Sequence, residues 1–278
     1  MVRYLIGFFG MLALCFTAQT LGLRAVGGKT AKSESNYFSS LARVQTASAE
    51  KPRVLMLGSS LTGRMSDRAA AVDGFVNIGC DGGSAAITLR AIDRGEIDPA
   101  STVVVEANTL AYDLDGRGSQ MSSAICGDWF QLGREVPNLG ATARPTAFVY
   151  SAMMKVKEGD PAPVEKPLPV ASKPGAYHGP APADLTEPEQ ALVDEMAGII
   201  GRLEERGSRV VLVLLPPGEI EGSSELRVAR GLAWASGAEW WDLNDGLPAD
   251  RVHFTDGRHM EAESAAETMA TLSGELLK

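Results

Sequence analysis

The stretch Arg53-Val-Leu-Met-Leu-Gly58-Ser59-Ser60-Leu61-Thr62 decides the fold of this chain. Its apolar run ends in a glycine and two serines, and the segment from Gly63 to Ala71 has helical character. A short apolar run of this kind, closed by glycine and followed by a helix, is typical of a buried parallel strand. We therefore expect the serine hydroxyls at the carboxyl end of a strand, beside a helix N-terminus.

The rest of the chain continues this strand and helix alternation. Further strands are expected at Phe75–Ile78, Thr102–Val105, Thr146–Tyr150, Arg209–Leu215 and Glu239–Leu243. Helices are expected at Ala85–Arg94, Ala191–Glu205 and Glu261–Leu277, and the second has a capping box at Thr186-Glu-Pro-Glu189 and a stop at Gly207. The alternation predicts an α/β fold, a three-layer α/β/α sandwich with a parallel, flavodoxin-like sheet of about five strands.

Composition limits the classes of function. The 278 residues and 45% hydrophobic content are enough to bury a core. The net charge of −9, without a basic stripe, argues against nucleic acid or anionic lipid surfaces as partners.

The N-terminal segment, residues 1–24, differs from the rest. An uncharged, mostly apolar run from Tyr4 to Leu23 is about long enough to span a bilayer as a helix. A cleaved signal peptide needs small residues before the cut, and Phe16 in Phe16-Thr17-Ala18 fits that poorly. We expect an uncleaved membrane anchor, with a cleaved secretory signal as the alternative. Either would place the remainder in the periplasm or outside the cell.

Two further segments are predicted to be irregular. Residues 25–50 are small and polar, which suits a linker to a catalytic domain at 51–278. An insertion at about 155–190 holds eight of the fifteen prolines and is expected to be a long extended loop. It is interpreted as a lid or acceptor-binding flap near the site, or as a surface insertion without a catalytic role.

A second motif, Asp256-Gly-Arg-His259, lies near the other end of the chain. A serine oxygen is a poor nucleophile unless a base takes its proton and a third group holds that base. We predict Ser60 as the nucleophile, His259 as the base and Asp256 as the group that orients it. This prediction requires the side chains of Ser60 and His259 to lie next to each other in the fold, although most of the domain's sequence separates them.

Four short motifs in this order resemble the SGNH (GDSL-type) hydrolase and acyltransferase superfamily, from about Arg53 to the C-terminus. They are Gly58-Ser59-Ser60-Leu61, the glycines of Asn77-Ile-Gly79-Cys-Asp-Gly82-Gly83, Glu106-Ala107-Asn108-Thr109 and Asp256-Gly-Arg-His259. The chain departs from the family where Ser59 stands in place of aspartate. It departs again where Glu106 and Thr109 stand in place of glycine and aspartate.

The resemblance implies an oxyanion hole as well as the triad. The donors would be the backbone N–H groups of Ser60 and Gly82 and the side-chain amide of Asn108, with Gly79 as the fallback for Gly82. Glycine at position 82 would let the backbone approach the substrate closely. Each donor that meets the oxyanion is worth a few kcal/mol.

These residues also have simpler interpretations. Ser60 could simply cap the following helix, Asn108 could be a turn residue, and Asp256-Gly257 a simple turn. A metal cluster of His253, Asp256 and His259 lacks companion ligands, so neither metal nor cofactor is expected.

Two features outside these motifs bear on other functions. The glycine spacing from Gly58 to Gly63 resembles a P-loop, but Arg64 and Met65 replace the lysine and the hydroxyl residue that it needs. Cys80 and Cys126 could form a disulfide after export, or be two buried thiols.

The expected chemistry is acyl transfer, and the acceptor is either water or a hydroxyl. The anchor and the Gly-Ser-Ser motif resemble exported envelope acyltransferases, which implies an acyl donor, a glycan hydroxyl acceptor and a membrane-bound O-acyltransferase partner. The leading hypothesis is a serine-dependent O-acetyltransferase for an envelope polysaccharide. A carbohydrate esterase with the same triad and a non-catalytic envelope-binding protein are the alternatives.

Overall fold

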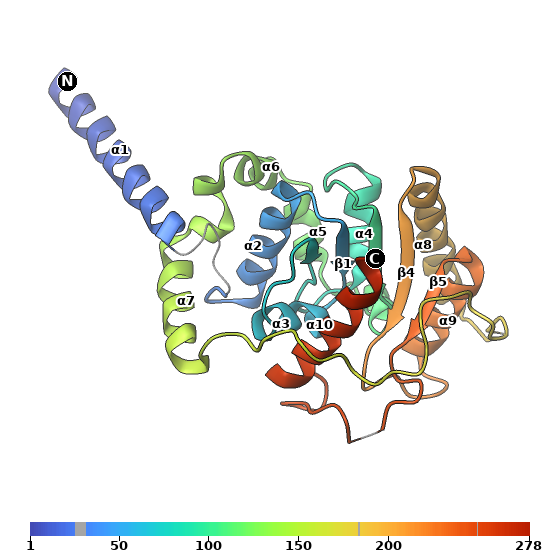
Figure 1. Cartoon of the computed structure of the whole chain (residues 1–278). Coiled ribbons are helices and arrows are strands. Elements are labelled where there is room, and N and C mark those ends of the chain that lie inside the picture. The colour runs from blue at the N-terminus through green and yellow to red at the C-terminus, as the bar shows by residue number, and fades with distance from the viewer. Residues whose placement is uncertain (26–31, 183, 249) are drawn as a thin grey trace.

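The computed structural model describes residues 1–25, 32–182, 184–248 and 250–278. Its centre is a five-stranded sheet in the order β2-β1-β3-β4-β5, and every pair of neighbouring strands is parallel (Figure 1). The strands are β1 (Val54–Leu57), β2 (Phe75–Asn77), β3 (Thr102–Glu106), β4 (Arg209–Leu214) and β5 (Glu239–Asp242). The predicted α/β fold with helices on both faces of a parallel sheet is confirmed, and the strand order is the flavodoxin-like one.

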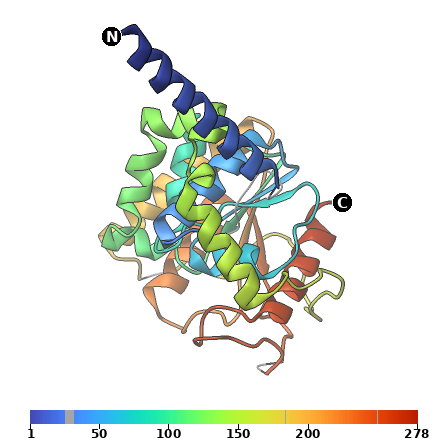
Figure 2. The same ribbon diagram turned by 90° about the vertical axis from the view of Figure 1, so that its left-hand side faces the viewer.

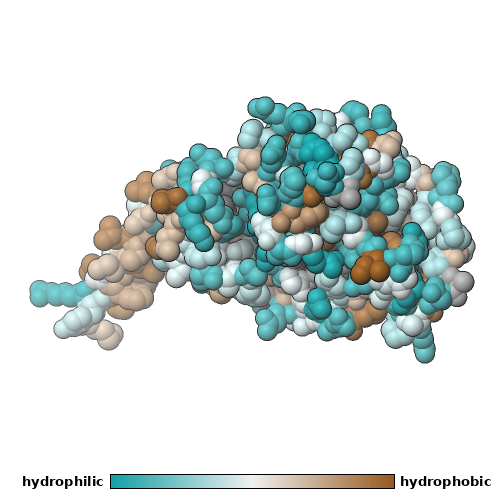
Figure 3. Space-filling model, turned by 90° about the horizontal axis from the view of Figure 1, so that it is seen from below, coloured by the Kyte–Doolittle hydropathy of each residue, from teal (hydrophilic) through white to brown (hydrophobic). Residues whose placement is uncertain are grey.

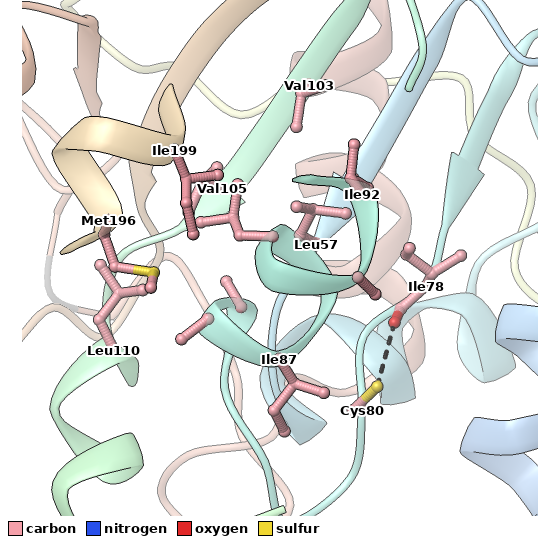
Figure 4. Close-up of a cluster of buried hydrophobic side chains, with 14 of the residues drawn as sticks. Leu57, Ile78, Cys80, Ile87, Ile92, Val103, Val105, Leu110, Met196 and Ile199 are labelled. Atoms are coloured by element: carbon pink, nitrogen blue, oxygen red, sulfur yellow. Dashed lines mark hydrogen bonds between the residues drawn. The ribbon is translucent and has the colours of Figure 1, made fainter. Parts of the chain in front are cut away.

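Both faces of the sheet are buried, which explains why its strands are almost continuously apolar. In β1, Leu55 and Leu57 point into one core cluster, while Val54 and Met56 point into the other. Val103 and Val105 of β3 join Leu57 in the first cluster, where side chains from the covering helices meet them (Figure 4). This alternation buries the apolar side chains of β1, β3 and β4 on both faces of the sheet.

The helices form two unequal layers. The first face of the sheet is covered by helices that contribute to the cluster around Leu57. These are α2 (Asn36–Ala49), α4 (Ala85–Asp93), α5 (Ser119–Ile125), α6 (Asp128–Glu135), α8 (Glu187–Glu205) and α9 (Ser224–Ser236). The second face is covered by α3 (Ser60–Arg68) and α10 (Ala262–Leu276). Three 3₁₀ segments, η1 (Leu110–Asp115), η2 (Pro137–Leu139) and η3 (Ala141–Ala143), lie between β3 and α7 (Pro145–Glu158) along the chain.

Local signals set several of these boundaries. The capping box predicted for α8 is present, with the Thr186 and Glu189 side chains each bonded to the other's backbone. Gly207 follows the end of α8 at a φ of 91°, a conformation that glycine adopts most readily. The expected helix from Gly63 to Ala71 begins at Ser60 instead and ends at Arg68.

One predicted strand is wrong. Thr146–Tyr150 belongs to α7, which begins with Pro145 at its first position. Proline favours that position because it lacks the N–H that a helix start leaves unpaired. The residues after Tyr150 are mostly good helix formers, and Ala147 is the buried position of the helix.

The linker predicted at 25–50 is also wrong over 36–49, whereas residues 26–31 of it lie outside the described part. Residues 36–49 form α2, capped by the Ser35 side chain, which accepts a hydrogen bond from the Phe38 N–H. Leu41 and Val44 of this helix are buried in the core. Small residues such as Ala42 also line its buried side, and this composition resembles that of a linker.

The N-terminal segment forms helix α1 (Val2–Ala25), which projects from the domain (Figures 1 and 2). Its stretch Val2–Gly22 has a mean hydropathy of 1.7 and is long and apolar enough to cross a membrane. The space-filling view shows this apolar helix leaving a largely hydrophilic body (Figure 3). Its length and composition agree with a membrane anchor or a signal sequence.

The proline-rich segment between α7 and α8 is extended, as expected, but it runs along the α10 side of the sheet. Ala162 pairs with Ala69 after α3, the Leu168 N–H donates to Thr271 of α10, and Gly175 pairs with Trp240 of β5. In the described part of the chain, its hydrogen bonds do not reach the predicted triad. We call residues 159–182 the strap, because these contacts hold α10 and the β5 edge instead of covering the site.

Candidate active site

The structure brings together the three residues of the predicted triad. Ser60 is the first residue of α3, directly after β1, and His259 lies in the loop between β5 and α10. The Ser60 Oγ lies 3.0 Å from the His259 Nε2, and the His259 Nδ1 lies 2.7 Å from the Asp256 Oδ2. Residues 199 positions apart therefore meet at hydrogen-bond distance.

The carboxylate of Asp256 fixes the orientation of this histidine. Its Oδ1 accepts the backbone N–H groups of Arg258 and His259, at 3.2 and 2.9 Å. Hydrogen bonds from the backbone and side chain of His259 hold the pKa of Asp256 well below its usual range. Because an ionised carboxylate only accepts hydrogen bonds, Nδ1 carries the proton and Nε2 is free to accept the Ser60 hydroxyl.

Arg64 is a site residue that the sequence analysis did not identify as one. It lies four residues after Ser60 on α3, and this helical spacing places both side chains on the same face. The Arg64 Nη1 lies 3.6 Å from the Asp256 Oδ2 and 3.2 Å from the His259 Nδ1. Since Nδ1 already donates to Asp256, the arginine acts as a cationic partner of that carboxylate.

A buried carboxylate from β3 supports the turn that carries the nucleophile. The Glu106 Oε2 accepts both the N–H and the hydroxyl of Ser59 at 2.7 Å, and the Glu106 Oε1 accepts the Thr109 hydroxyl at 2.9 Å. Burial raises the pKa of Glu106, and these hydrogen bonds oppose that rise. Ser59 in turn caps α3 by accepting the Leu61 N–H. A carboxylate at position 106 thus braces the turn that carries Ser60.

Glycine at position 58 makes this arrangement possible. A Cβ on Gly58 would lie 2.8 Å from both the Cβ and the Oε2 of Glu106. Any larger residue would push Glu106 away from Ser59.

Two of the three predicted oxyanion donors are unoccupied in the described part of the chain. The N–H groups of Ser60 and Gly82 have no hydrogen-bond acceptor there, whereas the Gly79 N–H donates to Asn77 Oδ1 at 2.9 Å. This favours Gly82 over Gly79 as the donor. An added Cβ at Gly82 would meet no protein atom within 4 Å, so the expected close approach of this backbone to a substrate stays a prediction. Its φ of 76° is what favours glycine.

Asn108, the third predicted donor, is fully buried and tied to the end of β4. Its Oδ1 accepts the Leu215 N–H at 2.7 Å and its Nδ2 donates to the Leu215 carbonyl at 3.0 Å. The Asn108 Nδ2 also lies 3.4 Å from the Glu219 Oε1, which the Arg258 Nη2 binds at 2.7 Å. An oxyanion at Asn108 therefore has to replace the Glu219 contact.

Glu219 is the second site residue that the sequence analysis missed. Its side chain is 6% exposed, and burial raises its pKa, although Arg258 and Asn108 oppose that rise. No motif contains it. Its place four residues beyond Leu215, in the loop that leaves the carboxyl end of β4, is a signal that could have identified it.

The remaining predicted reactive groups lie apart from the triad. Cys80 is buried, Cys126 is exposed and both are free thiols, so the structure does not pair them. His178 and His253 are exposed. No group of three or more metal-ligating side chains occurs among residues 1–25, 32–182, 184–248 and 250–278.

A cavity of about 1100 Å³ lies elsewhere, between α2, α7 and the β2 edge, and its described lining includes Asp67 and Phe148. Burial raises the pKa of Asp67 to about 6. The lining contains none of the triad residues, so the cavity is separate from the candidate site.

Comparison of the chain with protein-family models, curated proteins and solved structures found no match.

Proposed function

We propose that this chain is a serine-dependent O-acetyltransferase that modifies a polysaccharide of the cell envelope through an acyl-enzyme on Ser60. The observation that carries the proposal is the continuous chain of hydrogen bonds from the Ser60 Oγ through His259 to Asp256. The resemblance to the SGNH superfamily supports the same roles for these residues.

The first half-reaction loads the enzyme. The Ser60 Oγ attacks the carbonyl carbon of the acyl donor while the His259 Nε2 takes the hydroxyl proton. The oxyanion that forms accepts hydrogen bonds from the backbone N–H groups of Ser60 and Gly82, and the dipole at the N-terminal end of α3 stabilises its negative charge. The donor's leaving group departs with the proton from His259, which leaves an acetyl ester on Ser60.

The second half-reaction transfers the acetyl group from Ser60 to the sugar. A sugar hydroxyl gives its proton to the His259 Nε2 and attacks the acetyl carbonyl. The Ser60 oxygen then leaves and recovers that proton. Asp256 balances the charge of the imidazolium ion in both halves.

The preference for transfer over hydrolysis rests on the apolar helix α1. Such a helix suits an enzyme held at a membrane, where an integral membrane acyltransferase would deliver acetyl groups across the bilayer from the cytoplasmic side. The domain would then lie in the periplasm or outside the cell. A specific observation favours the esterase as the second candidate: the Asp256 side chain is 48% exposed, so water has access to the edge of the triad.

The test measures how an acetyl group partitions between water and sugar. The full chain in detergent is given para-nitrophenyl acetate, with and without N-acetylglucosamine oligomers, and acetylated sugar and free acetate are both measured. Formation of acetylated sugar would support transfer, and acetate release that does not depend on the sugar would support the esterase. If neither product forms, the result would support a non-catalytic protein.

Two variants tie the activity to the site. S60A should lose several orders of magnitude in rate and should resist labelling by a fluorophosphonate probe. S66A changes an exposed serine on the same helix and should keep both properties. Equal activity of S60A and S66A would overturn the proposal.

A further inference from the structure

Three apolar side chains are exposed on the surface next to α1. Trp129 and Leu132 lie on α6, and Leu139 lies on η2; they are 62%, 38% and 37% exposed, respectively. Phe130 and Gly133 of α6 are buried, so the helix has one side in the core and one apolar side in solvent. We call the surface formed by Trp129, Leu132 and Leu139 the α6–η2 face.

This face lies at the end of the domain where α1 is attached. The Gln19 side chain of α1 donates to the Ala143 carbonyl of η3, and the Asn138 side chain of η2 donates to the Thr20 hydroxyl. Two perpendicular views show α1 leaving the domain on the side where α6 lies (Figures 1 and 2). A bilayer that surrounds α1 up to Gly22 therefore reaches the level of α6 and η2.

The chemistry of the face suits the interface of a bilayer better than bulk water. Tryptophan is enriched at the headgroup level of membranes, where its ring is buried and its N–H stays hydrated. The two leucines add apolar area that enters the acyl boundary. The exposed carboxylates Asp128 and Glu135 border the face, so it gains no attraction from anionic lipids and suits a zwitterionic surface.

We propose that the α6–η2 face rests in the headgroup region of the membrane as a second contact beside α1. With a span and a surface patch both held, the domain has a fixed tilt instead of rotating freely about its anchor. The inference rests on the part of the proposed function that keeps α1 as an uncleaved span.

Brominated lipids provide the test, because bromine on the acyl chains quenches tryptophan emission on contact. The full chain is reconstituted into phosphatidylcholine vesicles with and without acyl-chain bromination, and flotation first checks that it is bound. The chain has four tryptophans and α1 has none, so each variant reports on the domain. W129F is compared with W234F, since Trp234 on α9 is similarly exposed at 60% and distant in sequence from α6.

Bromination should quench the wild type and W234F alike, and W129F should lose more than half of that quenching. Equal quenching in W129F and wild type would overturn the inference. So would Trp129 emission that is quenched only by iodide in the water, because that result leaves the face in solvent and open to a protein partner instead of the membrane. A chain that fails to float would remove the anchor, and with it this inference, while the Ser60 activity could still be measured.

Discussion

Glu106 provides the sharpest test of how this site is supported, because one buried side chain accepts from three donors. Replacing it by alanine leaves the Ser59 N–H, the Ser59 hydroxyl and the Thr109 hydroxyl without their acceptor. Each buried group that loses its partner costs about 1–3 kcal/mol. E106A should therefore lower the free energy of unfolding by at least about 3 kcal/mol, a large part of the total for a typical domain.

E106Q is the matched control. Its amide oxygen can still accept from Ser59, and the Thr109 hydroxyl can turn to accept from the amide nitrogen. Exchanging charged for neutral hydrogen bonds costs about 1 kcal/mol each, but removing a buried charge offsets part of that cost. E106Q should therefore be destabilised by less than about 2 kcal/mol.

The pH dependence of the free energy of unfolding provides a second, independent test of Glu106. Burial raises the pKa of Glu106 above its ordinary value of 4.5, so the folded state binds this proton more tightly than the unfolded chain. The contribution of this group is fully present below pH 4.5 and is lost as the pH rises through the folded pKa. The stability of E106Q relative to wild type should therefore improve as the pH rises.

Urea unfolding of the full chain in detergent, followed by tryptophan fluorescence, measures all three proteins. The fluorophosphonate labelling rate adds a check on the site, since a loosened Ser59 no longer holds the start of α3. If E106A and E106Q unfold within about 0.5 kcal/mol of each other and label equally fast, Glu106 does not brace the nucleophile turn as described.

Three further predictions follow from neighbouring contacts. E219Q should raise the kcat/KM for ester cleavage roughly three- to tenfold, because it removes a negative charge 3.4 Å from the Asn108 amide nitrogen; a lower value would show that the carboxylate aids catalysis. D256N should slow acyl-enzyme formation about 10²- to 10⁴-fold with little change in melting temperature, since this side chain is half exposed. Stopped-flow kinetics and a melting curve measure the two effects, and an unchanged rate with a large drop in melting temperature would contradict the prediction. G79A should be destabilised by more than about 2 kcal/mol, because its Cβ would lie 2.5 Å from the Gly63 nitrogen and 2.6 Å from the Ser59 carbonyl oxygen. G82A should be destabilised by only about 1 kcal/mol, the cost of a positive φ for alanine. Equal melting temperatures of the two variants would contradict the close packing at Gly79.

The parts of the fold that followed from sequence are those with a strong local signal. The strand at Val54–Leu57 is a short buried run closed by glycine, and the capping box at Thr186 marks a helix start directly. The segment Thr146–Tyr150 misled because β-branched and aromatic residues also occur in helices, and Pro145 was the stronger signal. Helix α2 was missed because small residues on its buried side resemble a linker.

The residues of the candidate site also differ in whether a local sequence signal marks them. Ser60, Asp256 and His259 belong to recognisable motifs, so their meeting could be expected. Arg64 and Glu219 belong to none, and their roles depend on distances that only the folded chain sets.

The strap has a consequence for how the domain assembles. Residues 159–182 are synthesised before β4, β5 and α10, yet they contact α10 and the β5 edge. The contacts with α10 and the β5 edge can therefore form only when the last third of the polypeptide has emerged, whereas Ala162 can already pair with Ala69 after α3. The serine at position 60 waits for the same segment, because its histidine arrives just before α10. A chain that stops before His259 would leave the strap without its α10 contact and Ser60 without its histidine partner.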